Sequence, residues 1–247
     1  MLLTGHPIRL TILDYGLFTV HANGRIIGLS GFLIDTDSDE HILIDTGMPA
    51  KYAHDAQAAS AEDRLGSFGA VVALSPENLP AAQLGRVGLT LDDITLHIVS
   101  HTHIDHIGAL HDVPAPILMA RAERDLPKPL YWQGAQPMGW PDRTCHLIDA
   151  DTDIGPGFRA LLTPGHAPGQ LAFELDLPQT GPVLLTSDAI SRPSEVDEAF
   201  VGSWDADQAL HHATRILARA DQRGAFIVYG HCPRQWPNLR KAPQSYR

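Results

Sequence analysis

Cysteine is almost absent from this chain, which holds only Cys145 and Cys232 among its 247 residues. The two lie far apart and form no CxxC pair, so the sequence indicates neither a disulfide framework nor a thiolate zinc cluster. No apolar stretch approaches the ~20 residues of a membrane-spanning helix, and Gly5, His6 and Pro7 interrupt the apolar start of the chain before a signal-peptide core forms. We therefore expect a cytoplasmic protein with no membrane partner.

Basic residues are also scarce, with 18 Lys and Arg against 29 Asp and Glu, for a net charge of −11. A surface of this sign repels the phosphates of nucleic acids and anionic membranes, so we expect a small-molecule substrate and no nucleic-acid partner. The length allows one large domain or two small ones. We expect a single domain over residues 1–247, and the sequence favours neither a monomer nor a homodimer.

Short apolar runs closed by turn signals make up most of the chain. They are rich in Ile, Leu and Val, which is typical of strands buried on at least one face. The predicted strands are 8–13, 31–34, 41–45, 94–100, 116–120, 159–162, 171–175, 183–186 and 226–229. Helices are predicted at 81–87, 121–126 and, between the N-cap Asp205 and the stop signal Gly224, at 206–223, whereas 48–76 and 127–141 look irregular. Strands in both halves with helices between them predict a layered α/β architecture.

The richest cluster of chemically active side chains is His101, His103, Asp105 and His106, directly after the predicted strand 94–100. Imidazole and carboxylate together suit zinc, iron or manganese, and four such groups are costly to cluster in a core without a cation. Taken alone, a short motif of this kind is more often a solvated loop than a metal site.

Three further predicted strands lead into a residue of the ligand type. These residues are His166, Asp188 and His231. Sheet proteins commonly gather functional side chains at strand ends, where the strands behind them fix the geometry. Four such ends converging on one cleft make metal binding the economical interpretation.

The combined pattern resembles the metallo-β-lactamase superfamily. It consists of the HxHxDH motif at 101–106, a TPGH motif that ends at His166, the later Asp188 and His231, and an early LIDTG segment at 43–47. The resemblance spans positions 41 to 231 and implies an α/β fold, an αββα sandwich of two mixed β-sheets flanked by helices.

The resemblance also implies a dinuclear site with two divalent metal ions. One ion would be bound by His101, His103 and His166, the second by Asp105, His106 and His231, with Asp188 bridging both. Zinc is the expected metal, and iron, manganese or cobalt are alternatives that the same ligands accept. Asp45 is expected either to orient a ligating histidine or only to close the turn before Gly47.

The segment that starts at His231 resembles one particular group within the superfamily. Its residues His231-Cys232-Pro233, the stretch 239–243, Tyr246 and Arg247 are similar to the C-terminus of the N-acyl homoserine lactonases. The implied reaction is hydrolysis of a lactone or related ester, N-acyl homoserine lactones among them, by a metal-bridging hydroxide. Asp105 or Asp188 would move the proton, and such an activity would serve quorum quenching. The alternatives are a glyoxalase-II-like thioesterase, another ester or β-lactam hydrolase of the same fold, and an iron-dependent redox enzyme.

One position departs from the lactonase pattern. Members of the family often carry a tyrosine three residues after the bridging aspartate, where this chain has Ser191. A lost preorganised donor costs ~10²-fold or more in rate, enough to shift the preference among lactones and esters. In the irregular segment 127–141, the side chains of Tyr131, Trp132, Met138 and Trp140 are expected either to line an acyl pocket or to pack in the core.

Overall fold

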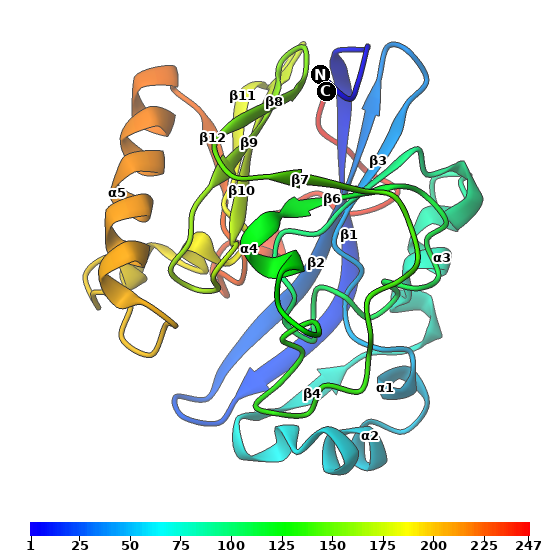
Figure 1. Ribbon diagram of the computed structural model, residues 1–247, viewed down its shortest axis with the longest axis vertical. Coiled ribbons are helices and arrows are strands. Elements are labelled where there is room, and N and C mark those ends of the chain that lie inside the picture. Colours follow the sequence, from blue (N-terminus) through cyan, green and yellow to red (C-terminus); the bar gives the residue numbers. More distant parts are fainter.

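Two β-sheets face each other in the centre of the molecule, and helices cover their outer faces (Figure 1). The structure is a computed structural model that describes residues 1–247. This is the αββα sandwich predicted from the sequence, and both sheets are mixed, as expected.

The larger sheet has seven strands in the order β4-β1-β2-β3-β5-β6-β7. The bounds are Pro7–Val20 (β1), Arg25–Thr36 (β2), His41–Ile44 (β3), Gly69–Ala73 (β4), Leu96–Ile98 (β5), Ile117–Ala120 (β6) and Cys145–Ile148 (β7). Neighbours from β4 to β3 pair antiparallel, and those from β3 to β7 pair parallel.

The smaller sheet has five strands in the order β12-β11-β10-β9-β8. The bounds are Thr152–Gly155 (β8), Phe158–Leu162 (β9), Leu171–Leu177 (β10), Gly181–Leu185 (β11) and Phe226–Val228 (β12). Only β11 and β12 pair parallel. The helices are Lys51–His54 (α1), Ala56–Asp63 (α2), Pro80–Gly85 (α3), Arg121–Arg124 (α4) and Ala206–Arg223 (α5).

Alternation along the strands of the larger sheet divides its side chains between two cores. In β2, Phe32 and Ile34 face the core between the sheets, where Phe158 and Phe173 meet them from the smaller sheet. Leu33, which lies between them in sequence, faces the outer core beneath α1, α2 and α3. This period-2 pattern is the physical basis of the strand predictions.

The helix predicted at 206–223 is confirmed with these bounds as α5. Asp205 caps it by accepting a hydrogen bond from the backbone N–H of Gln208, and Gly224 ends it with a φ of 61°. The helix packs on the outer face of the smaller sheet (Figure 1). Its buried face consists of Ala209, Ala213, Ile216 and Ala220, and the neighbouring Leu210 and Leu217 are only partly buried.

Two of the secondary-structure predictions were wrong or incomplete. The segment 48–76 is not irregular, because it forms α1, α2 and β4. Strands β7 and β8 were missed because each is a short, partly exposed edge strand with too few apolar residues to show a pattern. None of the helices is long and apolar enough to cross a bilayer.

The C-terminal tail is attached to strand β1 by backbone hydrogen bonds. Leu10 and Tyr246 exchange two backbone hydrogen bonds of 2.9 Å, and the N–H of Ala242 donates to the carbonyl of Ile12, also at 2.9 Å. The tail therefore runs along β1, and it brings the C-terminus next to the N-terminus (Figure 1).

Candidate metal centre

The predicted ligands all follow strand ends. The segment 101–106 follows β5, His166 follows β9, Asp188 lies in a 3₁₀ turn after β11, and His231 follows β12. The structure brings the seven residues together in three overlapping groups whose potential ligand atoms lie within 4.8 Å of one another. The first group is His101, His103 and His166, the second is Asp105, His106 and His231, and a third, His101 with His106 and Asp188, joins the two.

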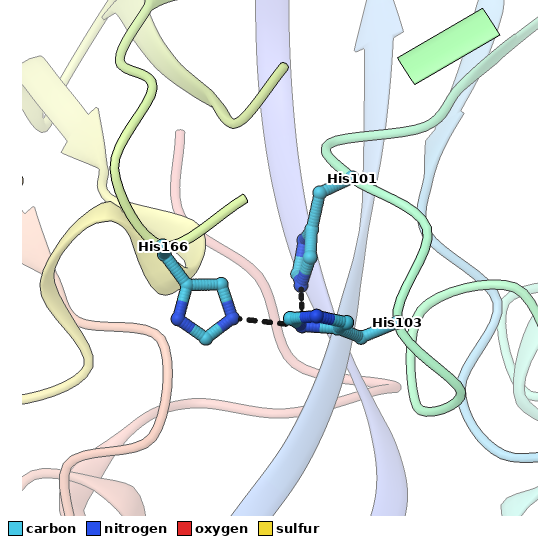
Figure 2. Close-up of side chains that lie close together, drawn as sticks. All are labelled: His101, His103 and His166. Atoms are coloured by element: carbon cyan, nitrogen blue, oxygen red, sulfur yellow. Dashed lines mark hydrogen bonds between the residues drawn. The ribbon is translucent and has the colours of Figure 1, made fainter. Parts of the chain in front are cut away.

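The first group consists of three histidine nitrogens that converge on one point (Figure 2). The Nδ1 atom of His103 lies 3.0 Å from Nε2 of His101 and 2.9 Å from Nε2 of His166. A tetrahedral zinc ion with Zn–N bonds of about 2.0–2.1 Å separates its ligand nitrogens by roughly 3.3 Å. The three nitrogens are therefore spaced almost as the ligands of a single ion.

Burial keeps the histidines of this first group neutral. It lowers the pKa of His103 to about 3, with a smaller contribution from His166, and it lowers the pKa of His101 well below the usual value. The pKa of His166 is lowered for the same reason. Because only the neutral imidazole has a free lone pair for a metal, the site favours the ligating form.

Asp188 lies between the first group and the second. Its Oδ2 atom is 3.4 Å from Nε2 of His166, and its Oδ1 atom is 3.1 Å from Nε2 of His231 and 3.5 Å from Nε2 of His106. Asp105 completes the second group, with Oδ2 3.6 Å from His106 Nε2 and 3.5 Å from His231 Nε2. One carboxylate thus reaches both groups, as a bridging ligand must.

Three of these atoms are buried and make no hydrogen bond. They are His106 Nε2, His231 Nε2 and Asp188 Oδ1, which all face the same space. More than nine in ten buried polar groups in native proteins find a partner, so three orphaned atoms in contact are a marked exception. A cation between them would satisfy all three, and the donor set therefore fits a metal ion.

The charges of the second group point the same way. Burial lowers the pKa of His231, but the carboxylates of Asp188 and Asp105 outweigh it and raise this pKa to about 9. Asp105, Asp188 and Asp45 likewise raise the pKa of His106 well above its usual value against the effect of burial. Burial also raises the pKa of Asp188, yet His231 and His106 bring it well below the usual range. The carboxylates of Asp105 and Asp188 thus stabilise positive charge on the neighbouring histidines. A divalent cation would supply that charge in place of the protons.

Asp45 fills both roles that the sequence left open. It sits in the turn after β3 with a φ of 60°, a conformation that aspartate tolerates better than most residues. Its Oδ1 accepts from the N–H of Ser100 at 2.8 Å, and its Oδ2 accepts from Ser100 Oγ at 2.6 Å and from His106 Nδ1 at 2.8 Å. Nδ1 of His101 lies 3.1 Å from that same Ser100 Oγ. Asp45 therefore orients one histidine of each group, directly or through Ser100.

His231 is oriented by the backbone of β2. Its Nδ1 donates to the carbonyl of Gly28 at 2.8 Å, which directs Nε2 toward Asp188. A Cβ atom at position 28 would lie 2.0 Å from the ring of Trp236, so only glycine admits the tryptophan that packs against this strand.

Glu123 was missed by the sequence analysis. It is fully buried on α4 and accepts hydrogen bonds from the backbone N–H of Thr102 at 3.1 Å, from the Thr102 hydroxyl and from the N–H of Gly169 at 3.1 Å. Thr102 lies between His101 and His103, so Glu123 ties the HxHxDH loop to the loop that follows His166. A lone glutamate in a short helix carries no sequence signal of such a role.

The aromatic side chains of segment 127–141 have separate environments. The Tyr131 hydroxyl donates to Asp63 at 3.0 Å from a buried position, and Trp140 donates through Nε1 to the carbonyl of Leu126 at 2.8 Å. The rings of Trp132 and Phe68 are in contact in a tilted arrangement, with centroids 4.9 Å apart and an interplanar angle of 48°, and Phe68 is 40% exposed. Tyr131 lies in the outer core, and Trp132, Met138 and Trp140 pack against that core, which agrees with the core-packing alternative.

Comparisons with known proteins give a consistent result. The family model described as the metallo-beta-lactamase superfamily matches residues 28–231. The chain is 28% identical over 234 residues to the N-acyl homoserine lactonase AttM of Azorhizobium caulinodans, covering 87% of this chain and 86% of that protein. It is 29% identical over 224 residues to the N-acyl homoserine lactonase AiiA of Bacillus thuringiensis subsp. kurstaki, covering 86% and 84%. A solved N-acyl homoserine lactone hydrolase with N-hexanoyl-L-homoserine at its catalytic metal centre superposes with a TM-score of 0.83 at 24% identity, over 98% of this chain and all of that one.

Proposed function

The chain belongs to the metallo-beta-lactamase superfamily, and from that premise we propose that it is a metal-dependent hydrolase that opens the ester bond of lactones. The observation that carries the proposal is the cluster of seven ligand-type residues with its three orphaned buried atoms. N-acyl homoserine lactones are the substrates to consider first, because the relatives similar over most of the chain are N-acyl homoserine lactonases. Such an activity would make quorum quenching the biological role.

We propose that the residues of the cluster hold two divalent ions. One set is His101, His103 and His166, the other is Asp105, His106 and His231, and Asp188 contacts both. Zinc suits three nitrogen ligands at the observed spacing and a mixed nitrogen and oxygen set beside it. When bound, such ions polarise an ester carbonyl and make water nucleophilic near neutral pH.

The chain's own carboxylates would handle the proton of the reaction. Ring opening leaves an alkoxide that must be protonated, so a carboxyl group within hydrogen-bonding reach of the leaving oxygen is required. Asp105 and Asp188 are the two candidates in the cluster, with side chains that are 21% and 7% exposed. We propose that Asp105, the more exposed of the two, takes up the proton that the attacking water gives up and passes it to the leaving oxygen, and that Asp188 remains a ligand.

Other features of the protein follow as parts of the same proposal. Residues 1–247 would act as one hydrolase domain, because the core between the two sheets draws side chains from both. A cytoplasmic location is consistent with two free cysteines, since reducing compartments keep thiols unpaired. The partner is a small molecule, consistent with the net charge of −11.

The experiment is a substrate panel on purified, zinc-loaded protein. N-acyl homoserine lactones of several chain lengths, a thioester, a β-lactam and a simple aryl ester are compared by product chromatography, with oxygen consumption recorded for the iron-loaded protein. We expect lactone opening that a chelator abolishes and zinc restores, and that His103→Ala removes. His211→Ala, on the exposed face of α5, is the matched histidine control and should retain the activity. Turnover of the thioester or the β-lactam without lactone opening would overturn the proposal, as would oxygen consumption without hydrolysis.

A further inference from the structure

A pocket of about 1070 Å³ has Cys232, the neighbour in sequence of the ligand-type residue His231, in one of its walls. Its walls come from the β1–β2 hairpin, the segment 192–198 and the segment 229–235. Cys232, which lines it, directly follows His231, and the N–H of His231 donates to the carbonyl of Ser191 at 2.9 Å. Ser191 in turn precedes Arg192, another lining residue, so this wall is continuous with the metal-binding segments.

Three arginines converge on this pocket in a protein that is strongly acidic overall. They are Arg25, Arg192 and Arg234, and the carboxylates of Asp197 and Glu198 also line the space. Arg192 is compensated, because its guanidinium pairs with Glu195 at 2.7 Å and with Glu198.

Arg25, which is half-buried, and Arg234, which is exposed, have no direct partner of opposite charge. Neither forms an ion pair, and neither guanidinium makes a hydrogen bond, although Nε of Arg25 is buried. Burial and then the positive charge of Arg192 lower the pKa of Arg25, and the more weakly acting carboxylates of Glu195 and Glu198 raise it, but an arginine stays protonated in proteins. A buried donor without a partner is destabilising, and an incoming acceptor removes that cost.

We propose that this arginine pocket binds an anionic group, a carboxylate or a phosphate, at the end of the substrate remote from the scissile ester. Guanidinium groups present paired N–H donors that match both anions. The volume slightly exceeds the usual range of ligand pockets, about 300–1,000 Å³, so it accommodates a side group and not only an ion. This inference rests on the proposed lactonase activity and names its substrate class: lactones with a negatively charged side group, in preference to neutral ones of equal size.

The test compares two γ-lactones that differ only at the end of the side group, one a free carboxylate and the other its methyl amide. We expect the zinc-loaded enzyme to have a kcat/KM about ten-fold higher for the carboxylate, mostly through KM. Arg25→Met and Arg234→Met should each bring that ratio toward one, and Arg25→Lys should keep part of it. Arg86→Met, an exposed arginine without an ion pair, is the matched control and should leave the ratio unchanged.

Inorganic phosphate separates an anionic side group of the substrate from a free anion as occupant. Competition between phosphate and the carboxylate lactone, weakened in Arg25→Met, supports the proposal, whereas phosphate binding without such competition contradicts it. A ratio near one that neither variant changes would overturn the arginine pocket while leaving the lactonase intact. Failure to open either lactone would instead overturn the proposed function itself.

Discussion

Replacing Asp45 with asparagine should disable the metal centre without removing a ligand. Oδ2 of Asp45 accepts from Ser100 Oγ at 2.6 Å and from His106 Nδ1 at 2.8 Å, and Oδ1 accepts from the Ser100 N–H. In Asp45→Asn the amide oxygen keeps the bond to the Ser100 N–H, so the amide NH₂ takes the place of Oδ2. The amide NH₂ of residue 45 and the Nδ1–H of His106 would then face each other as two donors. The clash is avoided only if His106 carries its proton on Nε2, the atom that points to Asp188 and Asp105.

The magnitude follows from this change of tautomer. An imidazole with its proton on Nε2 has no lone pair there, and lost outer partners of this kind typically reduce metal affinity by about 10–100-fold, or about 1.4–2.7 kcal/mol. We expect the larger loss for the second ion, because His106 contacts Asp45 directly, whereas His101 of the first group reaches Asp45 only through Ser100.

Competitive chelator titration with zinc measures the two affinities separately. The matched control is Asp35→Asn, since Asp35 is also buried and contacts a histidine Nδ1, that of His41 at 2.6 Å, away from the cluster. The control should lose stability and keep both zinc affinities. Two unchanged affinities in Asp45→Asn would refute the tautomer reasoning, and an equal loss in both variants would mean that the effect is general destabilisation.

Three further predictions concern the surroundings of the site. In Glu123→Gln one of the two accepting oxygens becomes an NH₂ donor, which cannot accept the hydrogen bonds made there. The free energy of unfolding should therefore fall by about 1–3 kcal/mol in chemical denaturation, and zinc should bind more weakly. Unchanged values for both would contradict the bridging role of Glu123. The free energy of unfolding of metal-free protein should fall between about pH 6.5 and 9. The pKa of His231 is raised to about 9 in the folded state, so the stabilisation from its proton is fully present below about pH 6.5 and is lost as the pH rises through 9. Urea denaturation across this range should show the decline without zinc and not with it. Tyr131→Phe should cost about 1 kcal/mol of stability, measured the same way, and leave lactone KM unchanged, since its hydroxyl serves Asp63; a raised KM would place this ring in the substrate pocket.

The sequence patterns predicted the layered α/β architecture because their signals are local, and the resemblance to a known family implied the αββα arrangement. Period-2 alternation in the long strands and the capped, amphipathic α5 are visible within a few residues of each position. The candidate ligands were equally visible, because each comes directly after an apolar run that ends at the site. What failed was the weakly patterned segment 48–76 and the edge strands β7 and β8, where few apolar residues mark the structure.

The residues that orient the ligands could not be predicted in the same way. The bond from His231 to the Gly28 carbonyl joins residues 203 positions apart, and those of Glu123 reach Thr102 and Gly169, 21 and 46 positions away. These partners exist only once the sheets have packed. Asp45 was a candidate only because the motif around it resembles a known family, and its three hydrogen bonds depend on the pairing of β3 with β5.

The zinc content of three proteins tests the central claim most directly. Wild-type protein, His103→Ala and His231→Ala are equilibrated with zinc, freed of unbound metal and measured by inductively coupled plasma mass spectrometry. We predict two zinc ions per chain in the wild type and one in each variant, because the two histidines belong to different groups of the cluster. Fewer than two ions in the wild type, or two retained in both variants, would contradict the dinuclear centre.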